Sequence, residues 1–226
     1  MIDQDNINKH LEKIHKSLNL VELVSITPNA EKIIAYCARV SNPDNQLSNS
    51  YEKLISYCIA NQHWSVFEQA SITMQIKTSR GISSQILRHR SFTFQEFSQR
   101  YAAVDESGLV VYAARRQDNK NRQNSIDDLS DEIRKEWEDR QLVNWKSSFE
   151  HYTWALNNGI AKECARFVLP LGCATTLYMT GTIRSWIHYI ELRTANGTQK
   201  EHMDIANECK AIFAKELPVI AKALNW

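Results

Sequence analysis

Apolar side chains recur along this chain with two spacings, one typical of amphipathic helices and one typical of half-buried strands. The strand spacing predicts strands over residues 21–26, 70–78, 109–114 and 175–180. The helical spacing, with its capping and stop signals, predicts helices over residues 28–38, 50–61, 80–89, 128–157, 162–169, 182–194 and 199–224. The chain thus contains both strands and helices, and we expect an α+β protein.

Two polar segments lie outside these elements. Residues 3–18 carry charged groups between apolar side chains at helical spacing, which predicts an N-terminal helix or a loosely held arm within residues 1–19. Residues 115–127 read RRQDNKNRQNSID and predict a mobile surface loop. Neither segment is assigned a function.

Composition limits the class of protein. A chain of 226 residues with 43% hydrophobic and 23% charged residues is typical of a globular protein, and we expect one domain over residues 1–226. Lys and Arg number 27 against 26 for Asp and Glu, so the net charge of +1 provides no field that would attract nucleic acid or a membrane. The first 19 residues are polar and no apolar run is long enough for a membrane span, so neither a signal peptide nor a membrane segment is expected.

The cysteines indicate the compartment. There are five, without a CxxC pair or the spacing of a zinc site, so no metal is expected and a reducing cytoplasm is the simplest location. They are Cys37, Cys58, Cys164, Cys173 and Cys209.

The chemistry of the sequence is concentrated in residues 88–101, which read RHRSFTFQEFSQRY. Arginine presents a fork of donors that matches two oxygens of a phosphate or carboxylate at once, so this cluster predicts an anionic, planar or phosphorylated ligand. If the helix over residues 80–89 is regular, Gln85, Arg88 and His89 lie on neighbouring positions of one face, and Arg90 points elsewhere. A solvated charged turn is the alternative, but three phenylalanines within the segment argue against it.

The order Arg-His-Arg, seven residues, Ser, one residue, Arg resembles the signature of the flavin-dependent thymidylate synthases. Arg88, His89, Arg90, Ser98 and Arg100 occupy all of its fixed positions. The resemblance extends from about residue 20 to residue 213. It implies a central, mostly antiparallel sheet flanked by long helices, a homotetramer with shared active sites, and the conversion of dUMP to dTMP. FAD as cofactor, NADPH as reductant and 5,10-methylenetetrahydrofolate as carbon donor follow from the same resemblance.

The resemblance also implies two sets of ligand contacts. The expected dUMP-binding residues are Gln85, Arg88, Glu96, Ser98, Arg100, Arg166 and Arg193, of which Arg193 is the expected catalytic residue at the uracil ring. The expected FAD-binding residues are Ser41, His63, Ser65, Arg88, His89, Arg90, Glu96, Thr182 and His188. At three positions the chain departs from the family pattern: Ser65 replaces a threonine, Gln69 a histidine and Thr182 an asparagine.

Three of these segments also have plainer interpretations. Arg166 has apolar neighbours in sequence, so we expect it to need an anionic partner, either a nucleotide or a structural carboxylate. Arg184, His188 and Glu191 recur at i, i+4 and i+7, which places them on one helix face, as a ligand site or as a self-neutralising polar stripe. His63 after a helix is a flavin contact or a capping histidine. The aromatic residues of helix 128–157 are expected to serve packing rather than to bind a cofactor: Trp137, Trp145, Phe149, Tyr152 and Trp154.

The absence of a Pro-Cys dipeptide argues against the cysteine-dependent route to thymidylate. In a flavin-dependent route the cofactor supplies the hydride, while the protein orients the substrate and stabilises the developing charge. Two other classes of protein remain open at this point. A non-catalytic nucleotide- or RNA-binding module would use the same arginines and phenylalanines, and a structural oligomerisation protein would explain the long helix and its tryptophans.

Overall fold

The computed structural model describes residues 14–16, 20–104 and 108–226. The predicted N-terminal helix or arm therefore lies mostly outside the described residues. The exception is Ile14–Lys16, which is strand β1 and pairs in parallel with β5 (Leu109–Val111). The helix prediction is wrong at these three positions, because hydrogen bonding to a neighbouring strand outweighs a weak local helical pattern.

Contacts divide the chain into two compact units. The first unit comprises residues 1–19, 77–87 and 96–177, and the second unit comprises residues 20–76, 88–95 and 178–226. Strands β3 (Ser71–Ser79) and β8 (Ala174–Thr182) continue from one unit into the other. The single domain expected from chain length stays a prediction.

A four-stranded sheet has the order β2-β3-β8-β4, with β2 at Leu20–Ile26 and β4 at Thr93–Glu96. Thr27 donates its N–H to the Ser71 carbonyl at 3.0 Å, and Gln75 Nε2 donates to Glu22 Oε2 at 3.0 Å. Residue numbers that rise on one strand as they fall on its neighbour define an antiparallel pair. The predicted α+β architecture with an antiparallel sheet and helices is confirmed.

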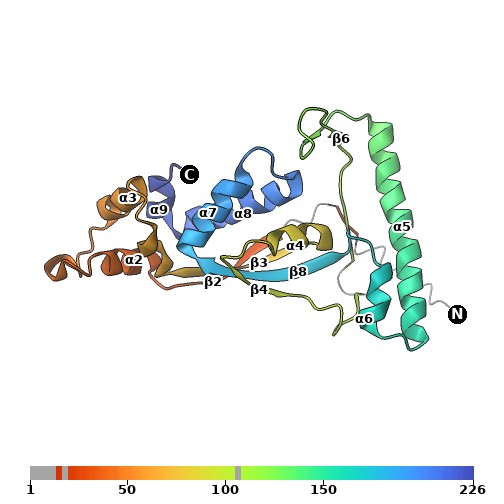
Figure 1. The fold of residues 1–226 in the computed structure, drawn as a ribbon, viewed down its shortest axis with the longest axis horizontal. Coiled ribbons are helices and arrows are strands. Elements are labelled where there is room, and N and C mark those ends of the chain that lie inside the picture. The colour runs from red at the N-terminus through yellow and green to blue at the C-terminus, as the bar shows by residue number, and fades with distance from the viewer. Residues whose placement is uncertain (1–13, 17–19, 105–107) are drawn as a thin grey trace. The chain divides into compact units, whose positions relative to one another are not determined.

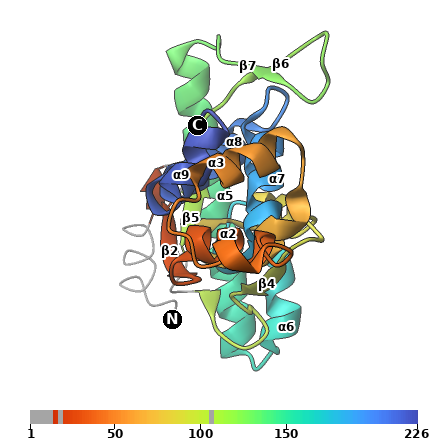
Figure 2. The ribbon, with the colours of Figure 1, turned by 90° about the vertical axis from the view of Figure 1, so that its left-hand side faces the viewer.

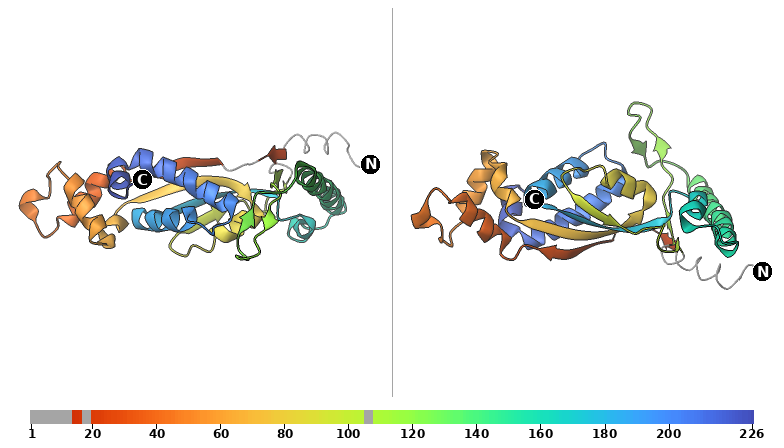
Figure 3. Two further views of the ribbon diagram at one scale, coloured as in Figure 1. Left: turned by 90° about the horizontal axis from the view of Figure 1, so that it is seen from above. Right: turned by 60° about the horizontal axis from the view of Figure 1, so that its bottom comes forward.

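Helices α7 (Ile183–Thr194) and α8 (Lys200–Glu216) lie over one face of this sheet in the second unit (Figure 3). Successive side chains of β3 point to opposite faces of the sheet, so Ile72 and Met74 are fully buried whereas Thr73 is partly exposed. Trp186 fixes α7 to the sheet by donating its indole N–H to the Ile72 carbonyl at 3.0 Å.

Three shorter helices complete the second unit: α2 (Ala30–Ala38), α3 (Glu52–Ala60) and α9 (Pro218–Ala223). Figure 2 shows α3 and α9 side by side. The continuous helix predicted over 199–224 is wrong, because Pro218 has no N–H to continue α8 and begins α9 instead. The carboxylate of Glu31 accepts hydrogen bonds from the backbone N–H groups of Val219 and Ile220, at 2.8 and 2.9 Å, and so caps the new helix.

The long helix α5 (Asp131–Asn157) and the short α6 (Lys162–Ala165) belong to the first unit (Figure 1). Ser130 caps α5, and Trp145, Phe149 and Tyr152 pack in a buried cluster. The packing prediction is wrong for the two other aromatic residues, since Trp137 is 45% and Trp154 58% exposed.

The polar segment 115–127 forms a small hairpin of β6 (Arg116–Gln117) and β7 (Ser125–Ile126) rather than a structureless loop. Asp118 accepts hydrogen bonds from the backbone N–H groups of Lys120 and Asn121, which closes the turn.

No helix in the part of the chain that the structure describes is both long and apolar enough to cross a membrane.

Candidate active site

The basic segment follows helix α4 (Arg80–Ile86). Because α4 ends at Ile86, the predicted helical face shared by Gln85, Arg88 and His89 is wrong. Residues 87–92 instead form turns that lead into β4, with Phe92 donating its N–H to the His89 carbonyl at 3.2 Å. Arg88 and Arg90 are exposed, whereas His89 is half-buried.

His89 belongs to a compact group of side chains in the second unit, which we call the α7 cluster. Its members are His89, Phe92, Trp186, Tyr189, Arg193 and His202. Arg193 Nε donates to His89 Nε2 at 2.9 Å, and the His89 ring meets the Tyr189 ring edge to face at a centroid distance of 4.9 Å. Tyr189 Oη and His202 Nε2 share a hydrogen bond of 3.1 Å with both residues fully buried. The cluster therefore joins the Arg-His-Arg segment to α7 and α8.

Burial controls the protonation of this cluster. Burial, followed by the charges of Arg193 and His188, lowers the pKa of His89 to about 4. Burial, with Arg193 and His89, lowers the pKa of His202 to about 3. Both imidazoles are neutral near pH 7, so the ring nitrogen of His89 that faces Arg193 can accept its hydrogen bond.

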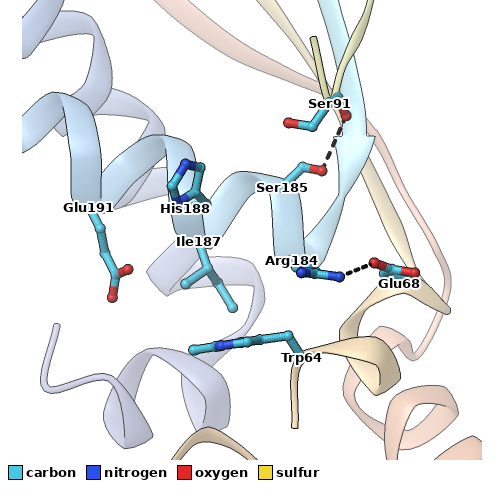
Figure 4. A pocket seen from close by; sticks show the side chains of 8 residues that line it. All are labelled: Trp64, Glu68, Ser91, Arg184, Ser185, Ile187, His188 and Glu191. Atoms are coloured by element: carbon cyan, nitrogen blue, oxygen red, sulfur yellow. Dashed lines mark hydrogen bonds and ion pairs between the residues drawn. The ribbon is translucent and has the colours of Figure 1, made fainter. Parts of the chain in front are cut away.

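A cavity of about 480 Å³ lies beside α7 in the second unit (Figure 4). It is lined by Trp64, Glu68, Ser91, Arg184, Ser185, Ile187, His188 and Glu191. Arg184 pairs with Glu68 at 2.5 Å, and Ser185 donates to the Ser91 carbonyl at 3.1 Å. The prediction that Arg184, His188 and Glu191 share one face is confirmed, and that face borders the cavity.

The expected FAD-binding residues are only partly at this cavity. His188 lines it, and His63 and Ser65 flank the lining residue Trp64 but are themselves exposed. Ser41 is exposed in the turn after α2. Thr182 caps α7, because its hydroxyl accepts the Ser185 N–H at 3.2 Å.

The sequence analysis did not select five of the lining residues: Trp64, Glu68, Ser91, Ser185 and Ile187. Trp64 and Glu68 lie on the 3₁₀ helix η2 (Trp64–Glu68), inside the segment that resembles the family. A 3₁₀ helix of five residues is too short to give a periodic signal, so only the contact of η2 with α7 reveals these two residues.

Glu96 lies in the first unit and is held by three protein partners. It accepts hydrogen bonds from Ser83 Oγ at 2.6 Å and Thr175 Oγ1 at 3.1 Å and pairs with Arg80 NH1 at 2.8 Å. Arg80 in turn donates to the Phe97 carbonyl at 2.5 Å. The carboxylate therefore orients Arg80, a residue that the sequence reasoning had not selected, and fixes the backbone before Ser98.

Five residues of the first unit form a second polar group, which we call the Arg100 surface: Ser98, Arg100, Tyr101, Lys162 and Glu163. They line a depression of about 650 Å³. Arg100 pairs with Glu163 at 3.0 Å with both side chains more than half exposed, and Lys162 Nζ donates to the Tyr101 carbonyl at 3.0 Å. Its cations suit an anionic ligand.

Arg166 is not deeply buried, and its need for an anionic partner stays a prediction. Arg166 begins the 3₁₀ helix η4 (Arg166–Val168), is only half-buried, and lies 5.5 Å from the centre of the Phe167 ring, which is itself 80% exposed. Within the described residues no carboxylate forms an ion pair with Arg166.

Gln85 is half-buried on α4. In the described part of the chain, no group of three or more His, Cys, Asp or Glu side chains is arranged to hold a metal ion.

Comparison with known proteins gives a consistent result. Residues 22–219 match the family model described as "Thymidylate synthase complementing protein". A protein of Paramecium bursaria Chlorella virus 1 named as a probable flavin-dependent thymidylate synthase is 57% identical over 213 residues, which cover 91% of this chain and 98% of the relative. A flavin-dependent thymidylate synthase of Synechocystis sp. is 52% identical over 196 residues, or 87% of this chain and 90% of the relative.

Solved structures agree with this result. The crystal structure of a UMP/dUMP methylase from Streptomyces cacaoi bound with 5-Br dUMP superposes with a TM-score of 0.82 at 26% identity, covering 94% of this chain and 96% of that chain. A second structure of that methylase, bound with 5-Br UMP, gives a TM-score of 0.83 at 27% identity.

Proposed function

Because this chain belongs to the flavin-dependent thymidylate synthase family, we propose that it catalyses the reductive methylation of dUMP to dTMP. The observation that carries the proposal is the arrangement of donors along α7. Arg184 and His188 line the cavity, and Arg193 lies farther along the helix, bonded to His89 of the signature. One helix thus presents an arginine and a histidine to a ligand site, and carries a second arginine that is hydrogen-bonded to His89 of the signature.

The cavity beside α7 fits part of a flavin. Trp64 and Ile187 offer apolar surface to a planar ring, and Arg184 and His188 offer hydrogen-bond donors at its edge. The exposed Arg88 and Arg90 suit the phosphates of FAD. When bound, the flavin would supply the hydride, with NADPH as reductant and 5,10-methylenetetrahydrofolate as carbon donor.

The protein's own part is to bind and orient dUMP. Arg193 would donate to the uracil ring and stabilise negative charge that develops there. The other proposed contacts are Gln85, Arg88, Ser98, Arg100 and Arg166. Glu96 would act through Arg80, because their ion pair holds the Phe97 carbonyl and hence the backbone that presents Ser98.

The proposal includes a homotetramer in the cytoplasm. Large apolar side chains exposed on the second unit support assembly, among them Val40 at 70%, Leu47 at 86% and Tyr57 at 57% exposure. The five free cysteines support a reducing compartment. Light scattering coupled to size-exclusion chromatography would give the mass of the assembly.

A spectroscopic experiment tests the activity. The purified protein is mixed with FAD, reduced anaerobically with NADPH, and then supplied with dUMP, with methylenetetrahydrofolate, or with both. We expect bleaching of the flavin by NADPH, and reoxidation with formation of dTMP only when both substrates are present. Binding of dUMP by a protein that retains no flavin at high FAD would contradict the proposal and would favour a non-catalytic nucleotide-binding module.

A further inference from the structure

We infer that His89 is a positioning residue for Arg193, whose guanidinium it orients by accepting a hydrogen bond while the buried Tyr189–His202 pair holds its ring in place. The inference deepens the proposed function and rests on it in one respect, the contact of Arg193 with the pyrimidine. This role differs from the expectation that His89 binds FAD.

The first observation is which nitrogen of Arg193 is used. The inner nitrogen Nε donates to His89 Nε2 at 2.9 Å, and within the described residues NH1 and NH2 form no hydrogen bond. A guanidinium has five N–H donors, so this bond leaves the four terminal ones for a ligand. A single bond to Nε also limits rotation of the planar group, so the terminal donors keep one direction before the ligand arrives.

The second observation is how the His89 ring is itself held. It meets Tyr189 edge to face at 4.9 Å and Phe92 edge to face at 6.5 Å. Tyr189 is fully buried, and its hydroxyl is bonded to His202, which is also fully buried. Aromatic rings packed in this way have few alternative rotamers, so the position of Nε2 is set by buried neighbours rather than by solvent.

The third observation is that His89 Nε2 is already occupied. An imidazole nitrogen that accepts a hydrogen bond carries no proton, so the proton of neutral His89 is on Nδ1. His89 therefore cannot donate from Nε2 to a flavin phosphate while it holds Arg193. The contact with Arg193 and a flavin contact through Nε2 exclude one another.

Three variants separate these roles. In His89→Gln the amide lies near the place of Nε2 and can still accept from Arg193. In His89→Asn the side chain is polar but too short to reach, and in His89→Leu the acceptor is absent. The dissociation constant of dUMP is measured calorimetrically without FAD, and kcat, KM and flavin content are measured on the FAD-loaded enzyme.

We expect His89→Leu and His89→Asn to weaken dUMP binding, or to lower kcat/KM, by roughly 10-fold to 100-fold, the range for a hydrogen bond to a charged group. His89→Gln should recover most of the loss. Flavin content should stay near the wild-type value in all three. If His89→Leu fails to fold, the Asn and Gln pair still decides the question.

A double-mutant cycle provides the decisive measurement. In an Arg193→Ala background the change His89→Leu should cost less than about twofold further, because the interaction it removes is already gone. An equal loss in both backgrounds would overturn the inference, as would a loss of flavin with unchanged dUMP affinity. If wild-type protein makes no dTMP but dUMP affinity still shows the coupling, the proposed function fails and the positioning role of His89 stands.

Discussion

The α7 cluster of the second unit and the Arg100 surface of the first unit each present an arginine to a proposed ligand, but they hold it by different means. Arg193 is half-buried and bonded to the uncharged His89. Arg100 is two-thirds exposed and paired with the carboxylate of Glu163. A neutral acceptor orients a cation without cancelling its charge, whereas a carboxylate competes with the anionic ligand that the cation would bind.

The buried histidines of the α7 cluster should make the free energy of unfolding depend on pH in the acid range, whereas an exposed histidine of the first unit should not. Burial holds the pKa of His89 at about 4 and that of His202 at about 3, against 6.5 in an unfolded chain. The unfolded state then binds more protons below pH 6.5, so the stability these neutral rings provide is complete above pH 6.5. It is lost as the pH falls toward 4 for His89 and toward 3 for His202, with a slope of up to about 1.4 kcal/mol per pH unit for each ring.

Urea unfolding of wild type and His202→Gln at pH 7, 5.5 and 4.5 measures this effect. Glu31 and Glu208 act in the opposite direction, because burial raises the pKa of each carboxyl. Both carboxyls are present in wild type and in His202→Gln. The difference between the two slopes of unfolding free energy against pH therefore measures the contribution of His202. The exposed His151 of the first unit provides the control His151→Gln, for which we expect the wild-type slope. A His202→Gln protein with an unchanged slope would contradict the prediction.

Packing around one glycine in each unit gives the second contrast. A Cβ added to Gly181 would overlap the Phe92 ring of the α7 cluster, whereas a Cβ on Gly81 would have its nearest neighbours at 3.6 Å, an ordinary contact. We expect Gly181→Ala to lower the free energy of unfolding by about 1–3 kcal/mol. Gly81→Ala, on helix α4, should be neutral or stabilising by up to about 1 kcal/mol. Urea unfolding of both variants is the measurement, and equal stability would show that Phe92 is loosely packed.

The smallest expected effect is at the Arg100 surface. Glu163→Gln removes the charge that competes for Arg100, so dUMP should bind roughly 2-fold to 5-fold more tightly, in line with the modest strength of exposed ion pairs. Calorimetric titration with dUMP checks this. Glu136→Gln breaks another exposed pair of the first unit, with Arg140, and should leave dUMP affinity unchanged. Weaker binding in Glu163→Gln would mean that the carboxylate orients Arg100 rather than competes with it.

Local signals were sufficient for elements that end at a strong cap or stop. The ends of α5 were predicted to within a few residues, and its C-terminal end was located from the stop signal Asn157-Asn158-Gly159. Signals failed where tertiary contacts compete with local spacing. Helix α4 stops three residues earlier than its periodicity suggests, since the chain must turn to place Phe92 against Trp186.

Functional residues also divide into those that local sequence identifies and those whose partners only the tertiary structure shows. The signature residues Arg88 to Arg90, Ser98 and Arg100 identify the family from sequence alone, because a fixed spacing of directed donors is rare by chance. The sequence could not show that Glu96 is bonded to Ser83, Thr175 and Arg80, since the two hydroxyls and the guanidinium come from other parts of the chain.

By itself, the sequence determined the class of fold, the family and the types of residue that carry the chemistry, because these depend on periodicity and spacing along the chain. Only the tertiary structure decided which partner each group has. His89 and Arg193 are 104 residues apart, and their hydrogen bond, like the burial that keeps His89 neutral, exists only once β4, α7 and α8 are packed. Protonation and orientation depend on solvent exclusion and contact distance, which local sequence does not encode.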